Sequence, residues 1–169
     1  MHRGLKLAHF VGLVVFLGSI LTFIVISALI EGASLENIAF GRNIISTGTN
    51  VLTLPGMWIL AVSGVLMSYK RYGLAQRFFQ IKLLIIVLMV INAYVFTVPA
   101  VTSATEIAVR SLEQGQLLPE YNVAYMQESI FGAANVLLTL AAASIGVWRV
   151  GVKSTTHGYI YTRNCNGPE

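Results

Sequence analysis

Charged residues are scarce in this chain. Lysine, arginine, aspartate and glutamate make up 11% of its 169 residues, whereas 56% are hydrophobic. A soluble domain carries about 25% charged residues, so the composition excludes an ordinary water-soluble protein. The net charge of +4 does not indicate nucleic-acid binding, because the basic residues sit at the ends of apolar runs. The composition predicts a protein whose main partner is the lipid bilayer.

Residues that hold metals or act as nucleophiles are also few. The single cysteine, Cys165, lies in the polar C-terminal tail, so no internal disulfide can form. There is no Cys-x-x-Cys, His-Glu-x-x-His, Gly-x-Ser-x-Gly or phosphate-binding glycine loop. Of three histidines only His9 falls in an apolar run, which excludes a haem held by two membrane-embedded histidines. Haem ligation by His9 alone, or by His9 with Met67 or Met89, stays open, as does copper held by histidine and methionine.

Four apolar runs are each long enough to cross a bilayer as a helix, which takes roughly 20 residues. The fold class is therefore expected to be all-α, a four-transmembrane-helix bundle. The bundle covers residues 1–152 and is followed by a polar tail at 153–169. The spans lie at about 7–29, 50–69, 78–99 and 123–150.

Two prolines and one mixed segment modify this simple pattern. Residues 38–53 alternate apolar and polar side chains, which predicts a helical segment that lies at the interface or lines a cavity before the second span. Pro55 is expected to kink or interrupt the helix there, since proline has no N–H to donate. The third helix is expected to continue beyond Pro99.

The distribution of basic residues predicts the orientation. The end of the bundle that holds both termini carries Arg3, Lys6, Lys70, Arg71, Arg77, Arg149, Lys153 and Arg163. The other end has only Arg42 and Arg110, together with five glutamates. Because cytoplasmic ends of membrane proteins are enriched in lysine and arginine, both termini and the polar tail are expected to be cytoplasmic.

Two ionisable side chains lie inside this cytoplasmic end. His9 and Lys82 are each about one turn inside their helices, and Met89 and Asn92 share the helix face of Lys82. Lys82 could extend its ammonium to the headgroups, and His9 could be an interfacial histidine bonded to water or a carbonyl. Alternatively both point into the bundle and form one site.

A second polar group is predicted at the opposite end, formed by Asn92, Glu128 and Asn135. Glu128 alone could instead be an exposed glutamate near a helix start. The fourth span also carries a stripe of polar or small residues at spacings of three and four, which suggests a face that packs against other helices. The stripe comprises Glu128, Gly132, Asn135, Thr139, Ala142 and Gly146.

Three short motifs occur in the order found in one group of membrane proteins. They are Leu-Lys-x-x-His-(apolar)-x-Gly at Leu5–Gly12, a proline-containing second helix with Thr53–Gly56 and Ser63-Gly64, and Phe79–Leu83, which is similar to Trp-x-x-Lys-(apolar). These motifs resemble a bacterial group of four-helix integral membrane proteins. The group includes uncharacterised members and, more distantly, CopD copper-resistance domains and HemJ-type protoporphyrinogen oxidases.

The resemblance implies roles for two residues. His9 falls where the HemJ-type enzymes have an essential histidine, and Lys82 where they have an essential lysine. Those bundles bind haem b and porphyrinogen in a bacterial inner membrane. The chain departs from them at Ile26–Leu29, where a histidine-bearing segment is expected, and at Asn92–Tyr94, which replaces a Tyr-His pair.

Three classes of function follow. The first is a protein associated with haem b or a porphyrin, with His9 as ligand and Lys82 pairing an anionic group. The second is a non-catalytic membrane subunit or assembly factor that packs against other subunits or a second copy of itself. The third is a carrier of a metal ion or small solute that uses Asn92, Glu128 and Asn135.

The expected topology can be tested with reporter fusions. A reporter placed after Glu113 should report the outside, and one placed after Val152 the cytoplasm, because an odd number of spans separates the two positions. Signals from the same side would remove the four-span topology.

Overall fold

The computed structural model describes residues 2–72 and 77–148, so the predicted tail at 153–169 lies outside the described residues. All secondary structure in these ranges is helical, which confirms the all-α part of the predicted fold class. In chain order the elements are α1 (His2–Ile30), α2 (Leu35–Gly48), the π-helical turn η1 (Thr49–Thr53), α3 (Leu54–Tyr72), α4 (Arg77–Ile91), the π-helical turn η2 (Asn92–Thr97), α5 (Val98–Gln114) and α6 (Glu120–Trp148).

These elements join into four helices that are long and apolar enough to cross a membrane. The second helix begins at Leu35, so the mixed segment is helical, as predicted, and belongs to the same helix as the second span. The third helix continues through Pro99, as expected. Both are about 50 Å long at a rise of about 1.5 Å per residue, which exceeds the hydrocarbon thickness of about 30 Å. The candidate spans are Arg3–Ile30, Leu35–Tyr69, Phe79–Gln114 and Glu120–Val147.

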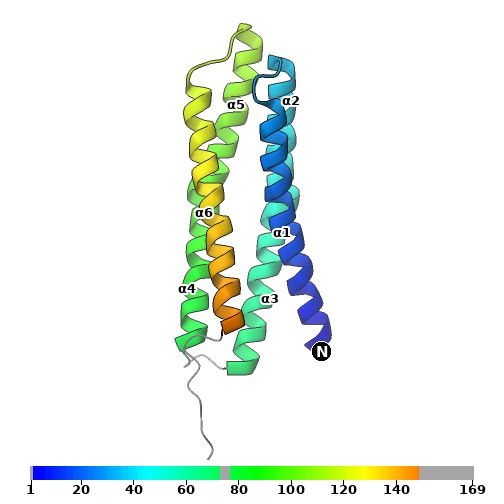
Figure 1. Cartoon of the computed structure of the whole chain (residues 1–169), viewed down its shortest axis with the longest axis vertical. Coiled ribbons are helices and arrows are strands. Elements are labelled where there is room, and N and C mark those ends of the chain that lie inside the picture. Colours follow the sequence, from blue (N-terminus) through cyan, green and yellow to red (C-terminus); the bar gives the residue numbers. More distant parts are fainter. Residues whose placement is uncertain (1, 73–76, 149–169) are drawn as a thin grey trace, which may run out of the picture.

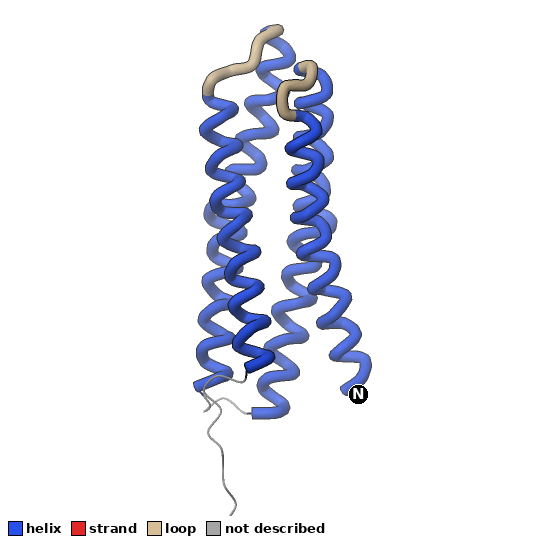
Figure 2. Tube along the Cα trace, viewed as in Figure 1, coloured by secondary structure: helices blue, strands red, loops and turns tan. Residues whose placement is uncertain are grey.

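The four helices stand side by side in two layers (Figures 1 and 2). One layer contains α1 with α2 and α3, and the other contains α4 and α5 with α6. α1 packs chiefly against α3, α2 against α5, and α6 against α5 and η2. We call the end with the two connecting loops the loop end, and the end where α1 begins and α6 finishes the terminal end.

Tight loops close the loop end. Gly32 and Gly115 have φ angles of 72° and 71°, a left-handed conformation that costs glycine little because it has no Cβ. Ser34 then caps α2, since its side chain accepts a hydrogen bond from the backbone N–H of Asn37. These turns return the chain directly, so consecutive helices are antiparallel neighbours.

A π-helical turn precedes each proline of the two long helices. The ring of a proline collides with the carbonyl four residues earlier in an α-helix. Here the residue before each proline donates its N–H to the carbonyl five residues back, Leu54 to Thr49 and Val98 to Ala93. The wider turn carries the helix across each proline, so Pro55 interrupts the α-helix without ending it.

Glycines let α1 and α3 approach each other closely. A Cβ on Gly12 would lie 2.7 Å from the backbone nitrogen of Leu60, and one on Gly56 would lie 2.9 Å from that of Phe16. Backbones come this near only where side chains are absent, which is how small residues join helices in lipid. The contact between these two helices therefore depends on one glycine from each.

The small residues of α6 were expected to bring helix backbones close together, and they do not. A Cβ on Gly132 would meet no atom within 4 Å, so the expectation that Gly132 brings helices together was wrong. A Cβ on Gly146 would lie 3.0 Å from Nζ of Lys82, which is a side chain and not a neighbouring backbone. The stripe instead faces the cavities described below.

Replacing Gly12 or Gly56, the glycines at the contact between α1 and α3, should destabilise the bundle. Gly12→Leu and Gly56→Leu place side chains where a backbone already lies, and overpacking of this kind costs about 1–3 kcal/mol or more. Thermal unfolding of the detergent-solubilised protein should show lower midpoints for both. Gly18→Leu is the matched control on α1, because a Cβ there meets nothing within 4 Å; an equal loss in the control would contradict the glycine contact.

Candidate functional site

His9 is held in one orientation by two acceptors on α3. Its Nδ1 lies 3.2 Å from the carbonyl oxygen of Leu60 and 3.0 Å from Oγ of Ser63. The Ser63 hydroxyl donates its single proton to the carbonyl of Ile59 at 2.5 Å, so it can only accept from the histidine. Both partners thus place a proton on Nδ1, and in the neutral imidazole Nε2 is then the nitrogen that carries the lone pair.

His9 and Lys82 line the same cavity, which we call the His9–Lys82 cavity. Its volume is about 190 Å³, and Met89 contributes to its wall. The other sequence candidate, Met67, is not among its lining residues. The structure therefore brings together His9, Lys82 and Met89, on α1 and α4, and leaves Met67 elsewhere.

Two glycines make room for the ionisable side chains of this cavity. A Cβ on Gly64 would lie 3.1 Å from Cε1 of His9, and one on Gly146 would lie 3.0 Å from Nζ of Lys82. Thr139 also contacts Met89, since its Oγ1 lies 3.4 Å from the methionine sulfur while its hydroxyl donates to the Asn135 carbonyl at 2.8 Å. The polar stripe of α6 thus serves this cavity through Thr139 and Gly146.

Near the loop end, Arg42 forms an ion pair with Glu128. Nη2 of the arginine donates to Oε2 of the glutamate, and the two side chains are 0% and 14% exposed. Glu128 is therefore not the exposed glutamate that the alternative interpretation expected. Each residue lies about 10–12 Å along its helix from the loop end, on α2 and α6 respectively.

The buried arginine was not anticipated as part of a site. Sequence reasoning counted Arg42 only as one of two basic residues on the outer side. The spacing of the sequence could have indicated it, because intervals of four, three and four residues place Ile38, Arg42, Ile45 and Thr49 on one helix face. In the structure all four are buried. Among the described residues, Nε and Nη1 of this arginine have no hydrogen-bond partner.

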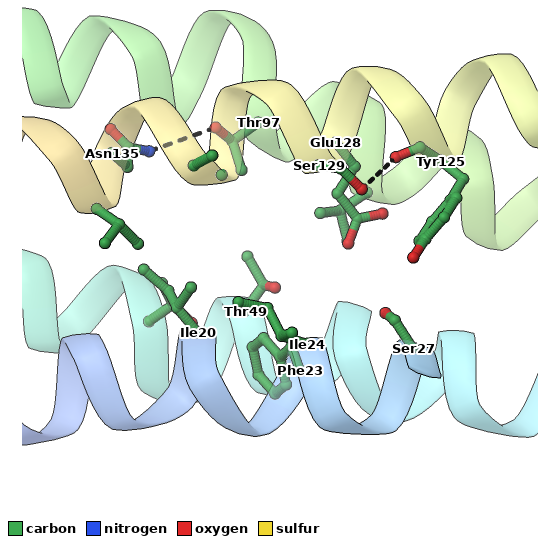
Figure 3. A pocket seen from close by; sticks show the side chains of 15 residues that line it. Ile20, Phe23, Ile24, Ser27, Thr49, Thr97, Tyr125, Glu128, Ser129 and Asn135 are labelled. Atoms are coloured by element: carbon green, nitrogen blue, oxygen red, sulfur yellow. Dashed lines mark hydrogen bonds between the residues drawn. The ribbon is translucent and has the colours of Figure 1, made fainter. Parts of the chain in front are cut away.

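Glu128 and Asn135 line a second cavity, partly open to the surface since Ile24 and Ser129 of its wall are exposed, which we call the Glu128–Asn135 cavity. Its volume is about 290 Å³. Its walls include threonines from both π-helical turns, namely Thr49, Thr53 and Thr97. Figure 3 shows the Glu128 side chain extending from α6 into the space between the two layers. π-Helical turns within α-helices occur frequently at functional sites.

The third member of the predicted polar group lies apart from this cavity. Nδ2 of Asn92 donates to the backbone carbonyl of Phe131 at 2.8 Å, and Asn92 is not among the lining residues. Asn135 donates to Oγ1 of Thr97 at 3.4 Å. The predicted grouping therefore holds for Glu128 and Asn135, whereas Asn92 joins η2 to α6.

An apolar layer lies between the two cavities. Phe16, Met57, Leu60, Met89 and Ala93 form one buried cluster. Leu60 and Met89 are also wall residues of the His9–Lys82 cavity. None of the described residues lines both cavities, so these are two separate and chemically different spaces, one toward each end of the bundle.

Within residues 2–72 and 77–148, no group of three or more histidine, cysteine, aspartate or glutamate side chains could hold a metal ion. No protein-family model, curated protein or solved structure matches the chain. The resemblance to the bacterial four-helix group thus rests on the three motifs quoted above.

Removing both partners of the ion pair should cost less than the sum of removing each one alone. Arg42→Met leaves a buried carboxylate and Glu128→Gln leaves a buried guanidinium, and each change should destabilise the protein by about 3–5 kcal/mol. The double variant Arg42→Met/Glu128→Gln should lose less than the sum of the two, because neither charge is stranded. Unfolding of the four proteins in detergent measures this, and additive losses would show that the pair is not coupled.

Proposed function

We propose that this chain is a multi-pass membrane protein that binds haem b or a closely related porphyrin at the His9–Lys82 cavity. The observation that carries the proposal is the orientation of His9. Its Nδ1 faces the Leu60 carbonyl at 3.2 Å, which leaves Nε2 as the nitrogen able to ligate iron. Histidines that bind metals usually donate their other ring N–H to a carbonyl or carboxylate in this way.

The other residues of the cavity suit the parts of such a cofactor. Lys82 supplies a cation for a propionate, and Met89 places a thioether on the same wall. Alanine and glycine occupy several wall positions, at Ala61, Gly64, Ala142, Ala143 and Gly146, and small residues favour a flat ligand between helices. When bound, haem would supply one-electron redox chemistry.

The small volume of the His9–Lys82 cavity means that a porphyrin can bind only if the cavity widens. Drug-sized ligands occupy cavities of about 300–1,000 Å³, and a porphyrin is larger than most of them, whereas the cavity measures about 190 Å³. Binding therefore requires the two layers to separate at the terminal end. α1 packs chiefly on α3, within its own layer, so the layers can part there without breaking the glycine contact between α1 and α3.

The location follows from the same proposal. Four apolar helices support a multi-pass membrane protein. We place it in a bacterial inner membrane with both termini cytoplasmic, on the basis of the basic residues and the motif resemblance. The cofactor site would then lie toward the cytoplasmic face.

Absorption spectroscopy tests the proposal directly. Protein purified from cells supplied with haem precursors should show a Soret band, and His9→Ala should abolish or shift it, because the axial nitrogen is lost. Lys82→Met should retain less haem while still inserting in the membrane, since removing a charge at membrane depth favours insertion.

Two methionines provide a matched control for this experiment. Met89→Leu should shift the spectrum or weaken haem retention, since Met89 lies in the wall of the cavity. Met67→Leu should leave both unchanged, since Met67 does not line it. A colourless parent protein would contradict the haem proposal and favour the membrane-subunit interpretation.

A further inference from the structure

Several oxygens of the Glu128–Asn135 cavity can only accept hydrogen bonds from a ligand, whereas the hydroxyls of Ser27 and Tyr125, which also line it, can donate. Thr49 donates its hydroxyl to the Ile45 carbonyl at 2.8 Å, Thr97 to that of Asn92 at 3.2 Å, and Ser129 to that of Tyr125 at 2.9 Å. A hydroxyl group has one proton. Because these protons are already used by the backbone, the three oxygens can offer only lone pairs to a ligand.

Asn135 and Glu128 add further hydrogen-bond acceptors to the wall of this cavity. Asn135 is 4% exposed and its Oδ1 has no hydrogen-bond partner among the described residues, so a buried acceptor in the wall is unsatisfied. Leaving such a group unpaired is unfavourable, so a ligand that donates to it would satisfy it. Glu128 lines the cavity whereas Arg42 does not, so the negative end of the ion pair is the end nearer the cavity.

The remaining wall and the volume indicate the kind of donor that fits. Phe23, Ile24 and Val101 add an apolar surface, and an aromatic face attracts cations. A volume of about 290 Å³ is near the lower limit for organic ligands. It is much larger than a bare metal ion needs, because a single water takes about 30 Å³.

We propose that the Glu128–Asn135 cavity binds a small organic ammonium ion, whose N–H groups donate to the wall oxygens while its hydrocarbon part contacts the apolar side. This site is separate from the haem proposal, because the two cavities share no lining residue. Either proposal can therefore fail without the other.

The test compares a cation with a neutral molecule of nearly the same shape. Purified protein in detergent is titrated with tert-butylammonium chloride, with tert-butanol, and with sodium chloride at equal ionic strength, and the unfolding midpoint is followed. We expect a saturable rise with tert-butylammonium only. An equal rise with the alcohol, a rise with sodium chloride alone, or no rise with tert-butylammonium would overturn the proposal.

Matched variants locate the site. Ser129→Ala and Thr49→Val each remove one wall oxygen and should weaken tert-butylammonium binding about tenfold or more. Ser144→Ala and Thr102→Val are the controls, since these hydroxyls also donate to the carbonyl four residues back, at 2.8 Å and 3.0 Å, but line neither cavity.

Each variant's unfolding midpoint without ligand shows that it has folded. Should a wall variant fail to fold, the other wall variant and the parent titration still decide the outcome. Equal weakening in wall and control variants would overturn the assignment of the site.

Discussion

A polar group inside a lipid-embedded bundle must find its partner within the protein, because no water is available to replace it. Most of the hydroxyls follow this constraint in one way, by donating to the carbonyl one turn earlier in the same helix. Thr22, Thr102 and Ser144 do so on exposed faces. The same bond at the cavity walls has a second effect, because it fixes which lone pairs remain for anything that enters.

The two ends of the bundle differ in their charged side chains. At the loop end the positive and negative partners are both protein side chains, and the pair joins α2 to α6 across the two layers. At the terminal end His9 and Lys82 share a cavity, and neither is an acid. The two cavities therefore differ in their ionisable side chains, a histidine and a lysine in one and a glutamate in the other.

The sequence was sufficient to predict the helices and some of the residues that line each cavity. Apolar run length predicted four spanning helices, and the helical spacing from Lys82 to Met89 correctly predicted that they share a face. The mixed segment before the second span was predicted to be helical, which the structure confirms, but its polar residues such as Asn43 and Thr47 hid the fact that one helix runs from Leu35 through the span. The partnership of Arg42 and Glu128 could not be read from the chain, because it joins residues 86 positions apart and depends on how the layers meet. Gly132 was misassigned, because spacing identifies a face but not whether a helix or a cavity lies opposite.

The π-helical turns have a consequence for which changes in chain length the protein can tolerate. Each turn acts like one extra residue inserted into an α-helix, so the halves on either side are out of phase by roughly 100°. Deleting one residue within Thr49–Thr53 would restore a uniform helix and rotate Arg42 about a quarter of a turn away from Glu128. The ion pair would then be lost although both of its side chains are still present. The number of residues between Gly48 and Pro55 thus sets which face of α2 is turned toward α6, a role that no single side chain of the segment performs.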